Sequence, residues 1–257
     1  MFQIALLPQV NRPIRLLCIG IVSSLLLLLM ACGSDNEADC LKSTGSITTE
    51  RRELPAFRQL YIYDNLEVVL VQDTAIYAEV RTGENLQEEI KLEVTNHQLI
   101  MRNTSTCNWT RRYDVPREIR LHTPSVLDVF QRDQSTLRIP TPFQADQFFY
   151  HFLGSGDADL NLHVQYLNMD MYELGDVTLR GTVASDAVTL LGGSGTLRTT
   201  DLTVRNLTLQ TTRGSIGDAH VRATNTLGIT HAGAGTVFYR APTPYVEVTG
   251  RGNVVAE

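Results

Sequence analysis

The sequence predicts an all-β protein whose C-terminal half forms a β-solenoid with about 20 residues per coil. Two observations carry this prediction: a glycine corner that recurs between Leu153 and Glu257, and short stretches of alternating apolar and polar residues between the corners. A fixed period in this range is the sequence sign of a stacked repeat. An antiparallel sandwich with regularly spaced turns remains the alternative.

The corner of each repeat is a glycine followed by a short apolar strand. The repeat glycines are assigned to positions 156, 175, 195, 214, 235 and 252, at intervals of 19, 20, 19, 21 and 17 residues. Gly214 belongs to an irregular copy, in which Arg213 stands where a second glycine is expected. Glycine accepts a positive φ and a close backbone approach, so it can turn a corner between coils.

Between the corners, residues alternate in short runs such as Val188-Thr189-Leu190 and Leu207-Thr208-Leu209. Alternation is expected to turn Val and Leu inward and Thr outward, and stacked coils then share one continuous core. The threonines expected outside are Thr189, Thr196, Thr199, Thr203, Thr208 and Thr211. Their hydroxyls would suit a ligand, which makes Thr189 and Thr208 candidate binding residues. The alternative is that they are ordinary solvated strand residues.

Residues 1–31 have the pattern of a lipoprotein signal peptide. Arg12 and Arg15 precede an apolar run that stops at Leu29-Met30-Ala31-Cys32, which resembles a bacterial lipobox. Such a segment is removed after export, and a lipid on Cys32 anchors the chain to a membrane. An ordinary signal peptide or a signal anchor is the alternative. Residues 32–43 are small and acidic and are expected to form a flexible tether.

The residues after Cys32 indicate where the lipoprotein is sorted. Position 33 is glycine rather than aspartate, which by the sorting rule of enteric lipoproteins points away from the inner membrane. The acidic stretch that follows resembles the surface-export signal of Bacteroidetes lipoproteins. We therefore expect a lipid-anchored protein of the cell envelope at the outer membrane. The acidic stretch favours exposure on the surface, and a simple spacer on a protein that faces the periplasm is the alternative.

Four cysteines are present, and two of them are accounted for by the N-terminal segment. Cys18 lies in the signal peptide and Cys32 takes the lipid, which leaves Cys40 and Cys107. An even pair in an oxidising compartment predicts a disulfide, with two separate thiols as the alternative. No Cys-x-x-Cys or His-x-x-x-His spacing occurs, so neither a metal nor another cofactor is expected.

Charge excludes some classes of partner. The full chain has 22 basic and 28 acidic residues, and removal of residues 1–31 takes away Arg12 and Arg15, so the net charge falls from −6 to −8. An acidic surface does not attract nucleic acid or anionic lipid directly. We therefore expect no nucleic-acid partner and membrane attachment through the lipid alone.

The N-terminal half also reads as β structure, and residues 44–257 are expected to form one domain. Asp64-Asn65 and Asn96-His97 are turn pairs between apolar runs, and only Glu84 to Glu89 has the character of a helical turn. The expected strands are Leu60–Tyr63, Leu66–Val71, Tyr77–Arg81, Ile90–Val94, Leu99–Arg102, Arg117–His122 and Val126–Phe130.

The order of these features resembles the putative auto-transporter adhesin, head GIN domain family, which is common in Bacteroidetes. The resemblance covers roughly residues 44–257. It rests on Arg52–Phe57 before Leu60–Ile62, Asp64–Gln72, Gly83–Leu86, the Gly-Ser-Gly repeats, Phe238–Pro242 and Gly250–Val254. It implies a right-handed β-helix-like fold and a location outside the cytoplasm, and it establishes no activity.

The function expected from these residues is non-catalytic binding of glycans or cell-surface proteins. The run Phe148-Phe149-Tyr150-His151-Phe152 should bury one set of alternate side chains, and the other set would form a binding patch, with Phe149 and His151 as its candidates. A polysaccharide-active enzyme is the alternative and needs a paired acid and base. The corner aspartates, Asp157, Asp159, Asp176 and Asp218, show no fixed pairing, nor the nine-residue period of a calcium repeat.

Overall fold

The computed structural model describes residues 43–105 and 115–257. The predicted signal peptide, nearly all of the tether, Cys32, Cys40 and Cys107 lie outside the described residues. Ser43–Glu257 forms one compact unit. It is a β-solenoid of about six turns with about 20 residues per coil, and it contains 66% strand and 3% helix, so the predicted fold class is confirmed.

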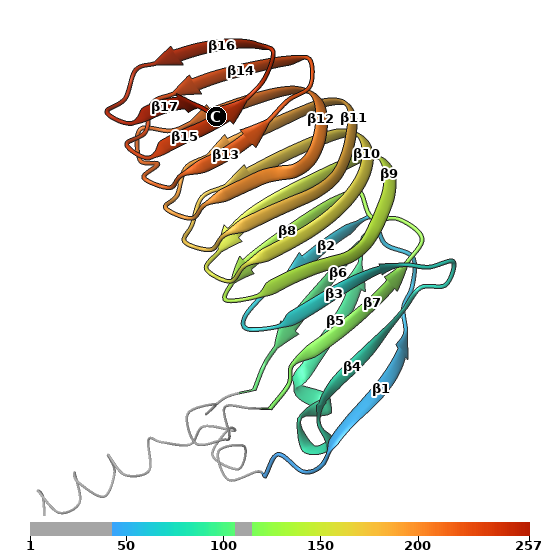
Figure 1. Cartoon of the computed structure of the whole chain (residues 1–257). Helices are drawn as coiled ribbons and strands as arrows, with labels where there is room; N and C mark the ends of the chain where they lie inside the picture. The colour runs from blue at the N-terminus through green and yellow to red at the C-terminus, as the bar shows by residue number, and fades with distance from the viewer. Residues whose placement is uncertain (1–42, 106–114) are drawn as a thin grey trace, which may run out of the picture. The chain divides into compact units, whose positions relative to one another are not determined.

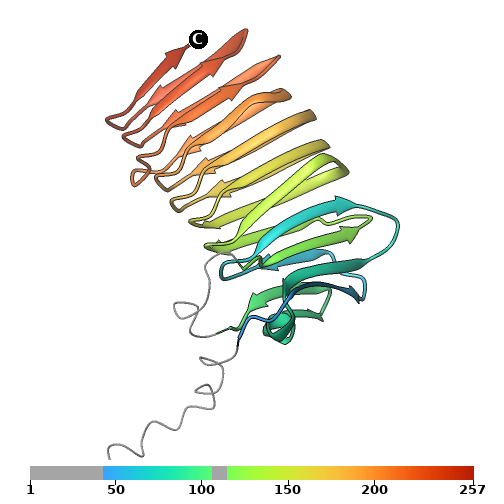
Figure 2. The same ribbon diagram turned by 60° about the horizontal axis from the view of Figure 1, so that its bottom comes forward.

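Each coil has two straight faces, joined by a tight corner on one side and a wide bend on the other (Figures 1 and 2). Four long strands run from the first face through the bend to the second face without interruption: β9 (Thr136–Gly154), β10 (Ala158–Met171), β11 (Val177–Leu191) and β12 (Leu197–Thr211). The glycine corner then returns the chain to the first face one level higher. Neighbouring long strands pair in parallel, which is the arrangement that distinguishes a solenoid from the antiparallel sandwich.

Shorter strands complete both faces of the stack. The first face continues through β7 (Glu118–Thr123), β3 (Glu67–Gln72), the starts of the long strands, β13 (Ala219–Arg222), β15 (Thr236–Arg240) and β17 (Asn253–Ala256). The second face continues through β6 (Gln98–Asn103), β2 (Gln59–Ile62), β8 (Asp128–Asp133), the ends of the long strands, β14 (Thr226–His231) and β16 (Thr243–Val248).

An antiparallel layer closes the N-terminal end of the stack. It consists of β1 (Ile47–Glu53), β4 (Tyr77–Gly83), the 3₁₀ helix η1 (Glu84–Glu89) and β5 (Ile90–Thr95). β4 pairs antiparallel with both β1 and β7, and β5 forms a hairpin with β6. The turn pair Asn96-His97 has φ of 52° and 61°, as a tight hairpin requires. Among the described residues, no helix is long and apolar enough to span a bilayer.

The core fills the space between the two faces. The aromatic run of β9 alternates as expected: Phe148, Tyr150 and Phe152 are buried, whereas Phe149 and His151 face outward and are half-buried. The hydroxyl of Tyr150 donates to Gln131 Oε1 at 2.6 Å, so its polar group is satisfied inside the core. Burial raises the pKa of Tyr150 well above its ordinary value.

The corner glycines form a column, and close approach is the reason for them. At 156, 175, 195, 217, 235 and 252, a Cβ would lie 1.9 to 2.1 Å from a carbonyl oxygen of the coil below. None of these glycines has a positive φ; among the described glycines only Gly45 and Gly181 do. The fourth corner is Gly217, so the assignment to Gly214 was wrong. The true intervals are 19, 20, 22, 18 and 17 residues. The interval of 22 is longer because the corner before Gly217 carries extra residues.

The outward placement of some threonines was also wrong. Thr189 is 1% exposed, Thr199 is 0% exposed and Thr211 is 5% exposed, whereas Thr203 and Thr208 are exposed as expected. In the run 188–190, the two aliphatic side chains cover the outer face, and Thr189 points inward. Its hydroxyl donates to the carbonyl of Thr208 in the next coil at 3.3 Å, which satisfies a polar group in the core.

Candidate functional site

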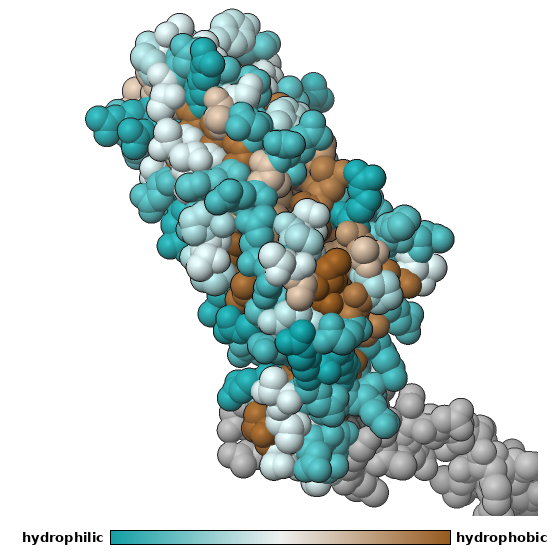
Figure 3. Space-filling model, turned by 90° about the vertical axis from the view of Figure 1, so that its right-hand side faces the viewer, coloured by the Kyte–Doolittle hydropathy of each residue, from teal (hydrophilic) through white to brown (hydrophobic). Residues whose placement is uncertain are grey.

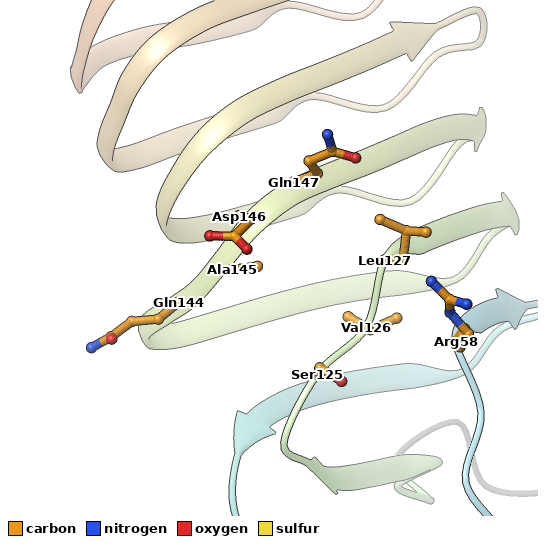
Figure 4. Close-up of a pocket in the computed structure, with 8 residues that line it drawn as sticks. All are labelled: Arg58, Ser125, Val126, Leu127, Gln144, Ala145, Asp146 and Gln147. Carbon is orange, nitrogen blue, oxygen red and sulfur yellow. The ribbon is translucent and has the colours of Figure 1, made fainter.

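The candidate site is a hollow on the bend side of the solenoid, close to its N-terminal end. It has a volume of about 400 Å³. One wall is the bend of β9, from Gln144 to Gln147, and the other is the connection from β7 to β8, Ser125 to Leu127, with Arg58 beside it (Figure 4). On this side of the molecule, apolar groups show between polar ones (Figure 3).

The hollow exists because β9 bulges where it bends. In the pairing of β9 with β10, Ile139 lies opposite Leu160 and Phe143 lies opposite Leu162, so three residues of β9 correspond to one of β10. The inserted segment is Pro140-Thr141-Pro142. Proline has no N–H to give to a ladder and is found at edges and bulges. The bulge therefore carries residues 144–147 away from the preceding coil and leaves room between them.

A single side chain holds the two walls together. Gln72, the last residue of β3, donates from Nε2 to the carbonyls of Pro124 at 3.0 Å and Gln144 at 2.9 Å. Its Oε1 accepts from the backbone N–H of Gln144 at 2.9 Å. The second wall is fixed further by the backbone N–H of Leu127, which donates to the carbonyl of Arg58 at 2.9 Å. The frame is therefore in place before any ligand arrives.

The lining offers polar groups that the protein does not use itself. Arg58 and Asp146 are exposed, and within the described part of the chain neither side chain has an ion-pair or hydrogen-bond partner. Gln144 and Gln147 add amide groups, which both donate and accept. Val126, Leu127 and Ala145 supply apolar surface between them. This combination can orient a neutral, hydroxyl-rich ligand over an apolar floor.

Phe149 lies directly beside the hollow. Its backbone N–H donates to the carbonyl of Leu127 at 2.8 Å, which ties the outer face of β9 to the second wall. The Phe149 ring is 6.1 Å from that of Tyr166, and their planes make an angle of 55°. Because the two rings are tilted rather than stacked, they do not cover one another's faces. The sequence-predicted binding residue Phe149 is therefore placed where it extends the apolar surface of the hollow.

His151 belongs to a different arrangement, a column of rings that stack from coil to coil. Tyr61 and Phe130 have centroids 4.4 Å apart and planes at 2°, and Phe130 and His151 have centroids 4.4 Å apart and planes at 16°. Each ring covers the face of the next, so the column presents ring edges to solvent. It joins adjacent coils and is not a platform for stacking a ligand.

Two carboxylates fix the imidazole of His151. Nδ1 is hydrogen-bonded to Oδ1 of Asp170 in the next coil, and Nε2 lies 3.1 Å from Oδ1 of Asp128 in the coil below. Gln59 Nε2 also donates to the other oxygen of Asp128 at 3.0 Å. His151 therefore links three coils on the second face.

The corner aspartates cap the coil above them. Asp157 accepts from the N–H of Asp176 at 2.9 Å, Asp176 accepts from the N–H of Thr196 at 2.8 Å, and Asp218 accepts from the N–H of Thr236 at 2.7 Å. Partial burial of Asp176 opposes its ionisation, but hydrogen bonds from Arg198 and Thr196 outweigh burial, so its pKa is lowered. These three aspartates thus satisfy backbone donors at the corners, whereas Asp159 forms an ion pair with Arg180.

The structure brings the predicted binding residues together only in part. Phe149 and Thr208 share one outward column, in which Asn168 and Val188 lie between them. Thr189 is buried and cannot meet a ligand. The hollow itself was missed by the sequence reasoning; the signal for it was the pair of prolines, Pro140 and Pro142, inside a β run. Among the described residues, no group of His, Cys, Asp and Glu side chains is arranged to hold a metal ion.

The fold and the hollow together define a class of protein: a β-solenoid with a shallow lateral hollow. The chain belongs to the family described as putative auto-transporter adhesin, head GIN domain, whose model matches residues 56–241. The predicted resemblance is therefore confirmed. No match was found among curated proteins.

Several solved structures have a similar fold. A putative adhesin from Bacteroides fragilis has a TM-score of 0.74 and 18% identity, with 82% of this chain and 97% of that chain covered. A putative lipid binding protein from Parabacteroides distasonis has a TM-score of 0.63 and 17% identity, covering 84% and 98%. A putative adhesin from the same species has a TM-score of 0.65 and 15% identity, covering 83% and 98%. At these identities the likeness concerns the fold.

Proposed function

We propose that this protein is a non-catalytic binding module of the cell envelope, which recognises a glycan in the hollow beside Phe149. The observation that carries the proposal is the hollow, with the unpaired Arg58 and Asp146 on its two walls. The adhesin names of the family and of its structural neighbours agree with a binding role. The corner aspartates support non-catalytic function because three of them cap the backbone and Asp159 is paired with Arg180.

A glycan fits the chemistry of this hollow better than a protein segment does. Sugar hydroxyls donate and accept at once, and the hollow offers amides, one guanidinium and one carboxylate within a small area. The C–H faces of a pyranose pack on apolar surface such as Phe149. The hollow is also shallow and open along the bend, which suits one unit within an extended chain. A protein partner would usually cover a surface of about 800 Å² on each side.

Replacing Arg58 with alanine is expected to weaken glycan binding at least about tenfold, since a hydrogen bond from a charged group contributes about 1.5–3 kcal/mol. Asp146→Asn should weaken binding in the same direction. The measurement is a glycan array with the unit Ser43–Glu257, followed by calorimetry on the sugars that bind. Arg138→Ala is the matched control, because Arg138 is an exposed arginine on the first face.

Two results would contradict this proposal. One is a sugar that binds equally well to the protein and to both hollow variants. The other is turnover of a polysaccharide that a single acidic substitution abolishes, which would identify an enzyme. If the protein bound an envelope protein and no sugar, it would still be a binding module, but its partner would be a protein rather than a glycan.

The same proposal places the protein on a membrane through a lipid at Cys32, at the outer membrane and facing outward. Its support is the apolar run that ends at Leu29-Met30-Ala31-Cys32. Expressed in a bacterium, the protein is expected to enter the detergent phase, and Cys32→Ala should release it or leave it unprocessed. Detergent partitioning of correctly cleaved Cys32→Ala protein would exclude the lipid.

The proposal also includes a disulfide between Cys40 and Cys107. Its support is the pair of cysteines that the signal peptide and the lipid leave over in an exported chain. Closing a loop of this length is expected to stabilise the fold by about 2–4 kcal/mol. Peptide mapping without reductant should recover the two cysteines in one linked fragment; two free thiols would remove this part of the proposal.

A further inference from the structure

The C-terminal end of the solenoid leaves its apolar interior uncovered. In β16, Pro244, Val246 and Val248 stand in register with Leu227, Ile229 and His231, which are buried in the coil below. Yet every residue of β16 is exposed, with Val246 at 39% and Val248 at 46%. On the opposite face, Val254 of β17 stands in register with the buried Val237 and is itself only half-buried. Inward positions are therefore open to solvent because no described element lies over the last coil.

The two ends of the stack differ in this respect. At the N-terminal end, β1, β4, η1 and β5 form an antiparallel layer, and the inward side chains beneath it, such as Leu60 and Leu99, are completely buried. Repeat proteins need a closing layer with a polar outer surface at each end. The C-terminal coil instead has an apolar interior and free strand edges, which attract another strand.

The free edge of β16 has a defined set of hydrogen-bonding groups. The backbone N–H of Thr249 donates to the carbonyl oxygen of His231 in β14 at 2.9 Å. In a parallel pair, alternate residues bond to the same neighbour, so the odd-numbered residues of β16 face β14. The even-numbered residues, among them Val246 and Val248, then point their N–H and C=O groups to the open edge. Pro244 falls in this second set, so its missing N–H costs nothing within the stack.

We propose that a second copy of this chain covers the open end, with the two C-terminal coils stacked end to end about a two-fold axis. The axis runs through the middle of β16, so the two β16 strands pair antiparallel and Val246 lies opposite its own counterpart. Val246 exchanges two hydrogen bonds with its counterpart, and the N–H of Val248 donates to the carbonyl of Pro244 in the other copy. A two-fold interface needs one surface that is complementary to itself, and this edge meets that condition.

The charges at the end of the stack fit the same arrangement. Pairing about Val246 places Glu247 opposite Tyr245 of the other copy, and both side chains lie on the outer face. The two Glu247 carboxylates are therefore not opposite each other, which avoids the repulsion of like charges in directly facing positions. Tyr245, which is 67% exposed in the single chain, gains a hydrogen-bond acceptor for its hydroxyl. The apolar Val246 and Val248 are removed from water at the same time.

A cysteine scan of the last coil tests the arrangement. The unit Ser43–Glu257 contains the whole described core, so it is used with Cys107→Ser as the background. Val246→Cys is expected to form a disulfide-linked dimer, because hydrogen-bonded antiparallel partners have Cα atoms about 5.5 Å apart, within the range of a disulfide. Tyr245→Cys is the matched control and should link poorly, since its partner residue is Glu247. Sedimentation should give twice the mass of one chain for the parent protein.

Val246→Asp is expected to shift the protein to monomer, with at least about a tenfold weaker dimer, since it places two carboxylates opposite each other. Circular dichroism and thermal melting of this variant confirm that it is folded, as expected for a half-exposed position. Thr208→Asp, on the middle of the second face, should leave the dimer intact. A parent protein that stays monomeric at every concentration tested, or a dimer in which Tyr245→Cys links as fast as Val246→Cys, overturns the proposal. Neither result bears on the glycan hollow, which lies at the other end.

Discussion

Gly217→Ala is expected to destabilise the fold by about 3 kcal/mol, at the upper end of the cost of overpacking. A Cβ at this position would lie 2.0 Å from the carbonyl oxygen of Gly195 in the coil below. That oxygen belongs to the backbone of a hydrogen-bonded coil, so it cannot move aside as the end of a side chain would. Chemical denaturation followed by circular dichroism measures the loss as a lower midpoint.

Gly214→Ala is the matched control for this prediction, since it makes the same substitution three residues earlier. The nearest atom to a Cβ at Gly214 is the carbonyl oxygen of Gly192 at 3.8 Å, and its φ is not positive. Alanine should therefore be tolerated there, or stabilise slightly by restricting the unfolded chain. Equal stability of the two variants would contradict the close-approach explanation of the glycine column.

Thr211→Val is expected to cost about 3 kcal/mol, because it leaves buried polar groups without partners. The Thr211 hydroxyl accepts from the backbone N–H groups of Ala232 and Gly233, both at 3.0 Å, and lies 2.8 Å from Nδ1 of His231. His231 Nε2 donates to the carbonyl of Gly235 at 3.0 Å. Nδ1 therefore accepts a hydrogen bond from the Thr211 hydroxyl. Valine has the right shape and supplies none of these bonds.

Two further variants separate lost hydrogen bonds from altered packing. Thr211→Ser keeps the hydroxyl and loses only a methyl group, so it should retain most of the stability. Thr208→Val makes the same exchange three residues away on the exposed face of β12, where the hydroxyl is in contact with water. It should change the free energy of unfolding by less than about 0.5 kcal/mol. If Thr208→Val proved as costly as Thr211→Val, the buried network would not be the cause.

The period of the solenoid was predictable because its cause selects the same residue type once in every coil. A glycine is required at each corner by contact with the backbone of the coil below, so the glycines mark the coil length directly. The misassignment of Gly214 shows the limit of that signal. Extra residues in one corner place a second glycine near the expected spacing, and only the stacking of Gly217 on Gly195 tells them apart.

The direction of individual side chains was less predictable. Apolar residues were taken to point inward, but Val188 and Leu190 lie on the outer face and Thr189 inside. The run 187–191 has apolar residues in both phases, and the phase is set by Ala187 and Leu191, which are buried in register with the neighbouring coils. Thr189 is tolerated inside because the carbonyl of Thr208 in the next coil accepts a hydrogen bond from its hydroxyl.

The hollow could not be derived from the sequence because it depends on segments that are distant in the chain. Gln72, Pro124 and Gln144 meet only when the coils stack. The two prolines in β9 indicate that the strand is interrupted, but not that the interruption opens a space beside Arg58. Alternation predicted that Phe149 and His151 share one face of β9, but it did not decide whether that face is outward, and the surroundings of Phe149 were not predictable.

The position of the hollow has a mechanical consequence. A pulling force applied between Ser43, where the chain enters this unit, and a ligand held at the hollow would cross only the first few coils. The coils from β11 onward would carry no tension, however long the stack became. The number of distal coils could thus vary without altering how strongly the protein resists detachment.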